Sequence, residues 1–508
     1  MSNLVQTLGT YTEKTPDAPA LISGLGAKRR VLTFAGVGRL SAAWAQTLSQ
    51  HGVKAGDHVL ILQPISIELY LALLAVFRIG AVAVFPDPQS LTATIEAACA
   101  RTKPVAMIGG WPAQLLRIAS RPLRRIGKTF SAAAVPWAAR FPREAKSQAG
   151  IANVSPDHPA LITFTSGSTG APKVIARSHG FLAAQHAAIL RAVDFIPGTA
   201  TMTALPVFVL SHLACGVTSI LPATDVRRPK DVDPGPMLAQ ITENKAHTIL
   251  GSPALVERLA HAADAAAKLA TVRDVFTGGG PIFPDIVEAA ARAMPAARIH
   301  LAYGSTEAEP IAHIEHKDIA PADIESTRAG RGLIAGPPTP GTSLAILRDR
   351  WGMPLAKLTQ SEFEALHVPQ GETGEIVVAG DHVVRSYVGG IGDAESKIDV
   401  EGRIWHRTGD AGWIDARGRL WLVGRCAYRL KDAPPLYPLQ VEAAARMALG
   451  PRPLAAAKVE GEAVLVVEGA APATGFGADR VVSVAKIPLD RRHQSKIDYA
   501  SLKALLNR

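Results

Sequence analysis

A run of small hydroxylated residues and glycines in the first half of the chain has the chemistry to hold a phosphate chain. The run consists of Thr165, Ser166, Gly167, Ser168, Thr169 and Gly170, and Lys173 follows it. The glycines let the backbone turn so that successive N–H groups face one side, the hydroxyls add donors, and the lysine adds a full positive charge. The common nucleotide loop Gly-x-x-x-x-Gly-Lys-Ser/Thr is absent from this stretch, and clusters of Ser, Thr and Gly are also typical of linkers. The composition alone therefore leaves both a phosphate site and a linker open.

A second stretch, Tyr303-Gly304-Ser305-Thr306-Glu307, combines groups that suit a nucleotide and its metal ion. Tyr303 offers a flat ring for an adenine, and Gly304 lets the backbone approach closely. Thr306 has a hydroxyl that can donate to an α-phosphate, and Glu307 supplies a hard oxygen ligand for Mg²⁺. The alternative is a core tyrosine beside a solvated glutamate on a turn. The further motifs around this stretch favour the nucleotide.

The two stretches resemble the motifs of the adenylate-forming superfamily, which holds acyl-CoA synthetases, luciferases and the adenylation domains of peptide synthetases. Similar segments follow in that family's order at 205–212, 248–253, 276–281, 371–376, 405–410, 424–425 and 490–497, so the resemblance covers nearly the whole chain. It implies ATP and Mg²⁺ as cofactors. The implied nucleotide-binding residues are Thr165, Ser166, Gly167, Ser168, Thr169, Gly170, Lys173, Gly278, Gly279, Gly280, Tyr303, Gly304, Asp410 and Arg425. The implied catalytic residues are Lys496, Glu307 and Thr306, with Glu307 also the metal ligand.

The activity implied by this resemblance is adenylation of a carboxylic acid. A substrate carboxylate attacks the α-phosphorus of Mg·ATP and forms an acyl-adenylate, while the 165–170 loop and Lys173 hold the β- and γ-phosphates. Asp410 accepts hydrogen bonds from the ribose hydroxyls, as a carboxylate at neutral pH should, and Arg425 reaches the ribose from the domain junction. Lys496 stabilises the charge that builds on the phosphorus and on departing pyrophosphate. An ordinary surface lysine is the alternative for Lys496.

Departures from the superfamily pattern bear on the second step of the reaction. Val209 stands where acyl-CoA synthetases carry a histidine or an aromatic gate, Ala427 replaces the usual hinge aspartate or lysine, and Ser495 replaces the glycine before the lysine. The loop after the hinge, 431–436, is usually rich in glycine but here contains prolines, which are stiff and exclude close approach of a pantetheine arm. These changes resemble the β-lactone synthetases of bacterial long-chain olefin and β-lactone pathways. That resemblance implies a 2-alkyl-3-hydroxy acid whose own hydroxyl displaces AMP.

Two other functions remain open from the sequence. A long-chain fatty acyl-CoA or acyl-carrier ligase shares the first half-reaction, and a non-catalytic adenylate-binding paralogue would keep only the nucleotide site. His212 and His493 are candidates for the general base that lactone closure needs. An apolar neighbourhood suits an alkyl chain, although a buried strand has the same pattern. It consists of Val207, Phe208, Val209, Cys215 and Gly216.

Apolar strands alternate with helices in the part of the chain that leads to the phosphate loop. The pattern predicts strands at 31–34, 58–62, 80–86, 105–108 and 160–164 and helices at 40–50, 66–77 and 91–100. Such alternation favours mainly parallel sheets covered by helices on both faces. The predicted fold class is α/β, with a large N-terminal domain of mainly parallel sheets flanked by helices (1–424) and a small mobile α+β C-terminal domain (428–508). The hinge at 425–427 is implied by the resemblance, and strands are expected at 456–459 and 464–467.

The composition bounds these interpretations. The 508 residues are 48% hydrophobic, enough for a substantial core and more than one domain. The longest apolar stretch is broken by Arg78 and Gly80, so it predicts no transmembrane helix, and the first residues show no secretory signal. Three cysteines, Cys99, Cys215 and Cys426, are widely separated and lack metal-ligand spacing, which suits the reduced cytoplasm.

The net charge of +10 comes largely from one segment. Residues 101–146 contain ten Lys and Arg residues against one acidic residue, Glu144, so the rest of the chain is near neutral. A local patch of this kind, without any nucleic-acid-binding motif, predicts no nucleic acid partner. Because apolar residues are interleaved with the charges, the segment could contact a membrane surface, an acidic carrier or a partner subunit; a solvated basic face is the alternative. The expected substrate is a small-molecule carboxylic acid, either a 2-alkyl-3-hydroxy acid or a fatty acid.

Overall fold

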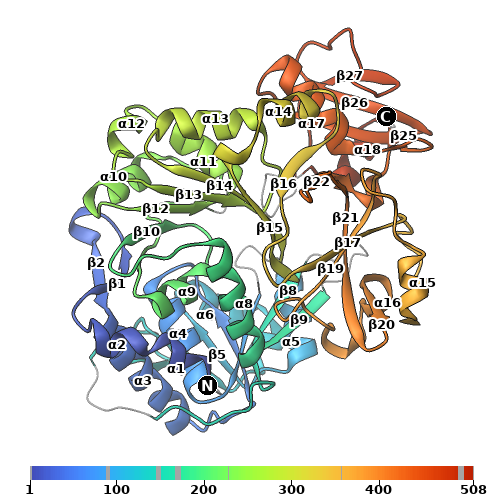
Figure 1. Cartoon of the computed structure of the whole chain (residues 1–508). Coiled ribbons are helices and arrows are strands. Elements are labelled where there is room, and N and C mark those ends of the chain that lie inside the picture. The colour runs from blue at the N-terminus through green and yellow to red at the C-terminus, as the bar shows by residue number, and fades with distance from the viewer. Residues whose placement is uncertain are drawn as a thin grey trace. The chain divides into compact units, whose positions relative to one another are not determined.

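The computed structural model resolves the chain into two compact units (Figure 1). Unit 1 contains Met1–Ala223, Ala239–Ala246 and Ser386–Ile391, and unit 2 contains Thr224–Leu238, His247–Arg385 and Gly392–Arg508. The residues that the structure describes are 3–86, 92–144, 150–165, 173–226, 228–355, 357–489 and 497–506.

A seven-stranded sheet forms the centre of unit 1, in the order β7-β6-β5-β3-β4-β8-β9. Its strands are β3 (His58–Leu62), β4 (Val82–Phe85), β5 (Ala106–Gly109), β6 (Lys128–Ser131), β7 (Ala139–Arg140), β8 (Pro159–Thr165) and β9 (Lys173–Ser178). All neighbours are parallel except β8 and β9, which pair antiparallel. Thr165, the last residue of β8, pairs with Lys173, the first residue of β9.

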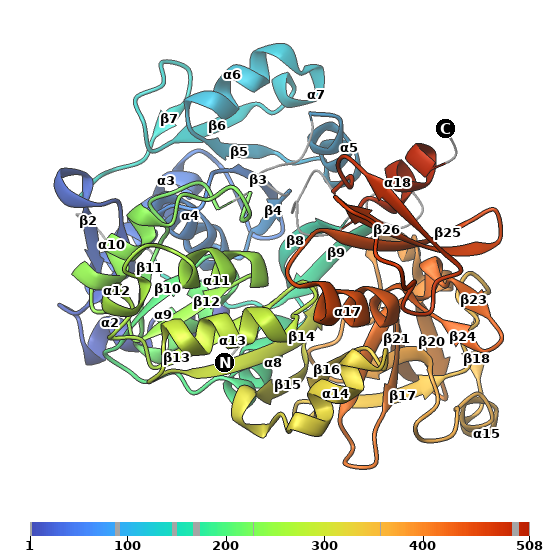
Figure 2. The same cartoon turned by 90° about the horizontal axis from the view of Figure 1, so that it is seen from above.

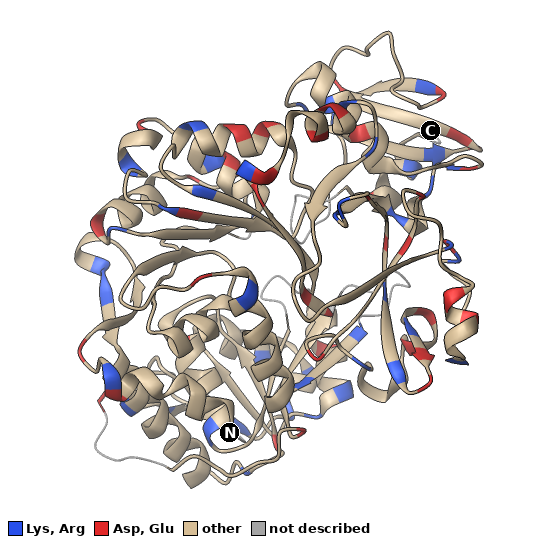
Figure 3. Cartoon of the chain, viewed as in Figure 1, with Lys and Arg blue, Asp and Glu red and all other residues tan. Residues whose placement is uncertain are grey.

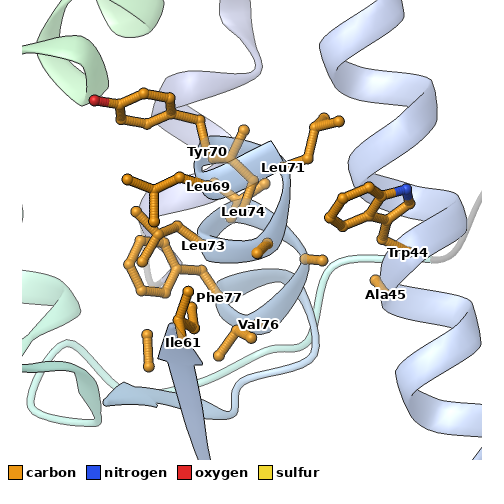
Figure 4. Close-up of a cluster of buried hydrophobic side chains, with 14 of the residues drawn as sticks. Trp44, Ala45, Ile61, Leu69, Tyr70, Leu71, Leu73, Leu74, Val76 and Phe77 are labelled. Carbon is orange, nitrogen blue, oxygen red and sulfur yellow. The ribbon is translucent and has the colours of Figure 1, made fainter. Parts of the chain in front are cut away.

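Helix α4 (Ile67–Arg78) shows why this sheet needs helices on its faces. The helix begins where the Ser66 hydroxyl accepts the Leu69 N–H at 3.3 Å, and it is apolar all round, so it is stable only when buried on every side. Its residue Leu71 lies toward α3 (Phe34–Gln50), from which Trp44 packs into the same core, and Tyr70 points to the opposite side of the helix (Figure 4). The core of unit 1 lies between these helices and the sheet.

Four further strands of unit 1 follow the order β10-β11-β1-β2. They are β1 (Pro19–Ser23), β2 (Arg30–Thr33), β10 (Ala200–Thr203) and β11 (Thr218–Ile220), and only β1 and β2 pair antiparallel. Helix α9 (Phe208–Cys215) connects β10 to β11 and ends at Gly216, whose φ of 70° is left-handed. A Cβ at Gly216 would lie 2.3 Å from Cε1 of Tyr11, so glycine is required there.

Unit 2 begins with three parallel strands, β12 (Thr248–Gly251), β13 (Asp274–Gly278) and β14 (Arg298–Ser305), and the antiparallel β15 (Ala308–Glu315). Helices α11 (Pro253–Ala260) and α13 (Pro284–Ala293) make the crossovers between the parallel strands. Charged residues mark the outer helices α13 and α14 (Pro321–Arg328), while the strands of this part are mostly uncharged (Figure 3). The turn from β14 to β15 holds Thr306 and Glu307.

The second sheet of unit 2 is largely antiparallel and follows the order β16-β22-β21-β19-β17, with β20 also paired to β21. Its strands are β16 (Leu333–Gly336), β17 (Ser343–Leu347), β18 (Lys357–Leu358), β19 (Gly374–Ala379), β20 (Lys397–Val400), β21 (Arg403–Ile414) and β22 (Leu420–Arg425). Asp410 on β21 pairs directly with Arg425 on β22. This register brings two predicted site residues together.

The last part of unit 2 is a small α+β assembly. It consists of the hairpin β23 (Lys431–Asp432) and β24 (Pro435–Leu436), helix α17 (Pro438–Leu449), strands β25 (Leu454–Val459), β26 (Glu462–Glu468) and β27 (Arg480–Val484), and helix α18 (Tyr499–Leu506). The three strands form one sheet in the order β25-β26-β27. Two apolar clusters pack against it, one of them with Val441 of α17 and the other with Leu502 of α18.

The mixed α/β class with parallel sheets flanked by helices is confirmed, as are the predicted strands and helices around it. The basic segment has secondary structure that the sequence analysis did not assign. It contains α6 (Trp111–Ala119), α7 (Arg121–Arg124), β6 and β7, and Figure 2 shows these elements at one side of unit 1 beside β5. None of the helices in the described ranges has the length and apolar character that a bilayer-spanning helix needs.

Candidate functional site

The predicted site residues are distributed over both units. Unit 1 holds Lys173 and the apolar residues around α9, and unit 2 holds the Tyr303–Glu307 stretch, Asp410, Arg425 and the three consecutive glycines. Ser166, Gly167, Ser168, Thr169, Gly170 and Lys496 lie outside the described residues, as does the candidate base His493. The backbone of Thr165 is described as the last residue of β8.

A phenol, a carboxylate and a guanidinium form the polar centre of unit 2. The Tyr303 hydroxyl at the end of β14 donates to Oδ2 of Asp410 at 2.7 Å, and Nη1 of Arg425 donates to Oδ1 at 2.9 Å. The Asp410 side chain stays 17% exposed and that of Arg425 50% exposed, so the cluster faces solvent from one side. Strand β14 and the paired strands β21 and β22 thus bring a flat ring, an acceptor and a cation together.

The charges of this cluster follow from its burial and pairing. Burial raises the pKa of Tyr303 well above its ordinary value, and the neighbouring Asp410 carboxylate adds to that rise. The same carboxylate raises the pKa of Arg425. Tyr303 therefore remains a neutral donor and Arg425 a cation at neutral pH. Asp410 is left with lone pairs for further donors such as sugar hydroxyls.

The turn that carries Glu307 is held in place by Val384, which is bound in turn by a buried lysine. The Glu307 carbonyl accepts the Val384 N–H at 2.8 Å, and Ala308 bridges to Val383. Nζ of Lys397, a residue only 7% exposed at the start of β20, donates to the Val384 carbonyl and lies 3.2 Å from Nδ1 of His406. Sequence reasoning missed Lys397, because nothing in its own neighbourhood marks it and its contacts are made through the fold.

The glycines predicted at the nucleotide site are placed where side chains do not fit. A Cβ at Gly278, the last residue of β13, would lie 2.6 Å from the carbonyl oxygen of Ala302 on β14, and one at Gly304 would lie 3.0 Å from that of Ala308. Gly279 has a φ of +83°, a conformation that favours glycine. Gly280 follows and is half-buried. The ends of β13 and β14 therefore keep a bare backbone beside Tyr303, as close approach of a ligand requires.

Lys173 begins β9 and pairs in register with Thr165 of β8. Its Nζ lies 4.9 Å from the centre of the Tyr387 ring, a cation–π distance within unit 1. Tyr387 is only 3% exposed, so its ring is a fixed support. Sequence reasoning did not assign Tyr387 to the site; the pairing joins segments far apart in the chain and leaves no local signal.

The five apolar candidates for substrate contact lie in α9 or at its two ends, and α9 is a helix, not the strand that the pattern also allows. Val209 is completely buried in the core of unit 1, and Phe208 is 9% exposed. Of the five, Val207 borders a small cavity of about 20 Å³ between α1 (Leu4–Leu8), α8 (His179–Ala192) and α9. That volume holds about one water molecule and no alkyl chain. Burial raises the pKa of Cys215 to about 11, so its thiol is protonated.

His212 is poorly suited to the role of general base. The side chain is completely buried, Nδ1 lies 2.7 Å from Oγ of Ser219, and Nε2 has no hydrogen-bond partner among the described residues. Burial lowers the pKa of His212 to about 3. A group with so low a pKa takes up protons weakly at neutral pH.

The unit 2 cluster fits an adenine nucleotide with its magnesium ion. A ring for the base, a carboxylate with free lone pairs for the ribose, a bare glycine backbone and a hard oxygen donor at Glu307 are present together. Among the residues that the structure describes, no three His, Cys, Asp or Glu side chains converge on a metal position. The Glu307 carboxylate is the group of this turn that could hold a divalent cation, together with the phosphates of the nucleotide.

Comparisons with known proteins agree with this chemistry. Residues 9–388 match the family model described as AMP-binding enzyme. The chain is 30% identical to the olefin beta-lactone synthetase of Xanthomonas campestris pv. campestris, over 98% of this chain and 96% of that protein, and 31% identical to the olefin beta-lactone synthetase of Stenotrophomonas maltophilia, over 83% and 77%. The solved O-succinylbenzoate coenzyme A synthetase of Bacillus subtilis, in complex with ATP and magnesium ion, superposes with a TM-score of 0.77 at 20% identity over 100% of both chains. The chain belongs to the AMP-binding enzyme family and is an adenylate-forming enzyme.

Proposed function

We propose that this enzyme converts a 2-alkyl-3-hydroxy carboxylic acid and ATP into a β-lactone, AMP and pyrophosphate. The observation that carries the proposal is the similarity, over nearly the full length of both chains, to an olefin beta-lactone synthetase. The absence of nucleic-acid motifs and the three free cysteines support a small-molecule reaction in the cytoplasm.

In the first step, a carboxylate oxygen of the acid attacks the α-phosphorus of ATP, and the bond to pyrophosphate breaks. Asp410 and Arg425 bind the ribose, Tyr303 supports the adenine, and Thr306 donates to the α-phosphate. Glu307 would hold Mg²⁺, which would neutralise phosphate charge during the transfer. The loop of Thr165 to Gly170 and Lys173 bind the β- and γ-phosphates, and Lys496 stabilises the charge that develops during transfer.

In the second step, the 3-hydroxyl of the activated acid attacks its own acyl carbon, and the hydroxyl proton is released to the solvent. A carbon–oxygen bond closes the four-membered ring, the bond to the AMP oxygen breaks, and AMP leaves. Intramolecular attack gains an effective molarity on the order of 10⁵ M or more in favourable geometries, which offsets part of the ring strain. The stiff β23–β24 hairpin at 431–436 supports this step, because a pantetheine arm would need open backbone there.

We further propose that residues 428–508 form a lid that turns about 425–427 between the two steps. In the present arrangement, contacts within unit 2 hold this segment to the residues before it. Asp349 accepts from the Tyr437 hydroxyl at 2.7 Å and from Arg429 at 3.1 Å, and Arg446 pairs with Asp285 at 2.6 Å. A turn of the lid would exchange these polar contacts for others.

The test gives the purified enzyme ATP, Mg²⁺ and a racemic 2-alkyl-3-hydroxy acid, with and without CoA, and identifies the acyl product by mass spectrometry. We expect lactone without CoA. The matching acid with a methylated 3-hydroxyl should still release pyrophosphate but form no lactone. A thioester that appears only with CoA would establish the acyl-CoA ligase instead, and release of no pyrophosphate with any acid would favour the non-catalytic paralogue.

A pair of lysine variants tests the first step separately. Lys496→Ala should slow pyrophosphate release by about 10²- to 10³-fold and leave ATP binding largely intact, because it removes charge stabilisation in the transition state. Lys503→Ala on α18, an exposed lysine in the same assembly, is the matched control and should behave as wild type. Unchanged pyrophosphate release in Lys496→Ala would remove that lysine from the mechanism.

A further inference from the structure

Helix α6 presents its apolar side chains outward. Trp111, Leu115 and Ile118 follow the i, i+4, i+7 spacing of one helix face, and they are 42%, 53% and 57% exposed. A surface helix of a globular protein normally shows the opposite pattern, with polar residues facing water. The exposed face of α6 therefore lacks a cover among the residues that the structure describes.

The helix is nevertheless firmly attached by its other face. Ala113 and Gln114 are buried, and the Gln114 amide donates to the carbonyls of Gly109 at 3.3 Å and Phe130 at 3.4 Å. These contacts fix α6 to the ends of β5 and β6. The outward direction of its apolar stripe is therefore set by the fold of unit 1, and a simple rotation of the helix would break this anchoring.

The apolar surface continues beyond the helix. Trp137, in the connection from β6 to β7, is 43% exposed and meets Trp111 edge to face at a ring distance of 5.7 Å. Tryptophan is the side chain most favoured at the boundary between lipid headgroups and acyl chains, because its ring is apolar and its N–H is polar. We call Trp111, Leu115, Ile118 and Trp137 the α6 patch.

The segment that carries the α6 patch is rich in positive charge. The described residues 101–144 contain nine basic residues and one acidic residue, Glu144. Arg121, Arg124 and Arg125 are exposed on and directly after α7, which packs against α6. An apolar stripe flanked by arginines complements a surface that is apolar inside and anionic outside. A lipid bilayer with anionic headgroups has both properties.

We propose that the α6 patch and its flanking arginines dock unit 1 onto the surface of an anionic lipid bilayer. The apolar side chains enter the boundary between headgroups and acyl chains, and the arginines contact the headgroup charges, without any segment crossing the membrane. This property goes beyond the proposed reaction and does not depend on it. It would bring the enzyme to the phase in which an acid with an apolar alkyl chain dissolves.

Flotation with lipid vesicles tests the proposal. We expect wild-type enzyme to float with vesicles of equimolar phosphatidylcholine and phosphatidylglycerol and to stay unbound with phosphatidylcholine alone. Salt should weaken the binding, because the Debye length falls from about 8 Å near 0.15 M to about 3 Å at 1 M. Removal of one flanking charge by Arg121→Ser should lower the partition coefficient roughly fivefold.

Two double variants separate the α6 patch from general stickiness. Leu115→Ser/Ile118→Ser should lose vesicle binding by more than about tenfold, because the buried methylene groups carry the apolar part of the attraction. Leu190→Ser/Met353→Ser, which changes exposed residues elsewhere, should bind as wild type. Circular dichroism and pyrophosphate release, expected unchanged in both, verify that the variants are folded.

Two outcomes would overturn the proposal. One is a failure of either flotation comparison: wild type floats equally with anionic and with neutral vesicles, or the two double variants float equally with anionic vesicles. The other is absence of vesicle binding together with a larger particle mass in light scattering that only Leu115→Ser/Ile118→Ser reduces, because the α6 patch would then be a protein interface.

Discussion

Acid should destabilise this protein through a histidine that the fold keeps uncharged. His212 on α9 is completely buried against Ser219, and burial lowers its pKa from the ordinary 6.5 to about 3. The unfolded chain takes up a proton at His212 near pH 6.5, whereas the folded protein does so only near pH 3. The contribution of His212 to stability is therefore fully present above pH 6.5 and is lost as the pH falls below it.

The size of the effect follows from proton linkage. Each pH unit in this window lowers the free energy of unfolding by about 1.4 kcal/mol, so pH 5 should remove about 2 kcal/mol relative to neutral pH. His212→Asn keeps a polar atom near the position of Nδ1 but does not titrate. Its smaller volume costs a constant amount at every pH, which cancels when the pH dependence is compared.

Urea unfolding at pH 7.5 and pH 5, followed by tryptophan fluorescence with refolding controls, measures the difference. The wild type should lose about 2 kcal/mol more than His212→Asn between the two pH values. His261→Asn, at an exposed position just after α11, is the matched control and should keep the wild-type pH dependence. An identical pH dependence in wild type and His212→Asn would refute the reasoning.

Three further substitutions test separate parts of the structure. Gly216→Ala places a Cβ against a tyrosine ring in a left-handed residue and should cost more than about 2 kcal/mol in urea unfolding, whereas Gly198→Ala, with a φ of +82° but open space, should cost about 1 kcal/mol. Glu375→Ala leaves the completely buried guanidinium of Arg407 without its carboxylate and should lower the free energy of unfolding by about 3–5 kcal/mol. The double variant Arg407→Met/Glu375→Leu removes both charges and should lower it far less. Equal losses in the two variants would contradict this reasoning. Tyr303→Phe removes one hydrogen bond to a carboxylate and should raise the dissociation constant for an ATP analogue about tenfold in calorimetry; an unchanged constant would exclude the phenol from the nucleotide site.

Elements with an unambiguous local pattern could be predicted from the sequence. Strand β3 was predicted at 58–62 and has those bounds, because a short buried run lies between a turn and a polar end. The pattern of α9 also allows a strand, since a short and mainly apolar run suits either element when it is fully buried. The helices of the basic segment were not predicted. Apolar residues of α6 have helical spacing but face the solvent, and the many arginines of the segment make the pattern hard to recognise.

In the candidate site, too, some residues could be predicted from local motifs and others could not. Tyr303 and Asp410 were assigned to one nucleotide site from separate motifs, and their side chains lie 2.7 Å apart. The support of Lys173 by Tyr387 and the contact between Lys397 and Val384 had no counterpart in the sequence pattern. Contacts of this kind depend on which distant strands meet, and a local pattern carries no information about that.

The fastening of Val384 has a consequence for the turn that carries Glu307. The Val384 N–H donates to the Glu307 carbonyl, and the Val384 carbonyl accepts from Nζ of Lys397, so the backbone next to this turn is held on both sides. The main chain at Glu307 is therefore already in place before any ligand arrives, and only the rotation of its side chain remains to be fixed on binding.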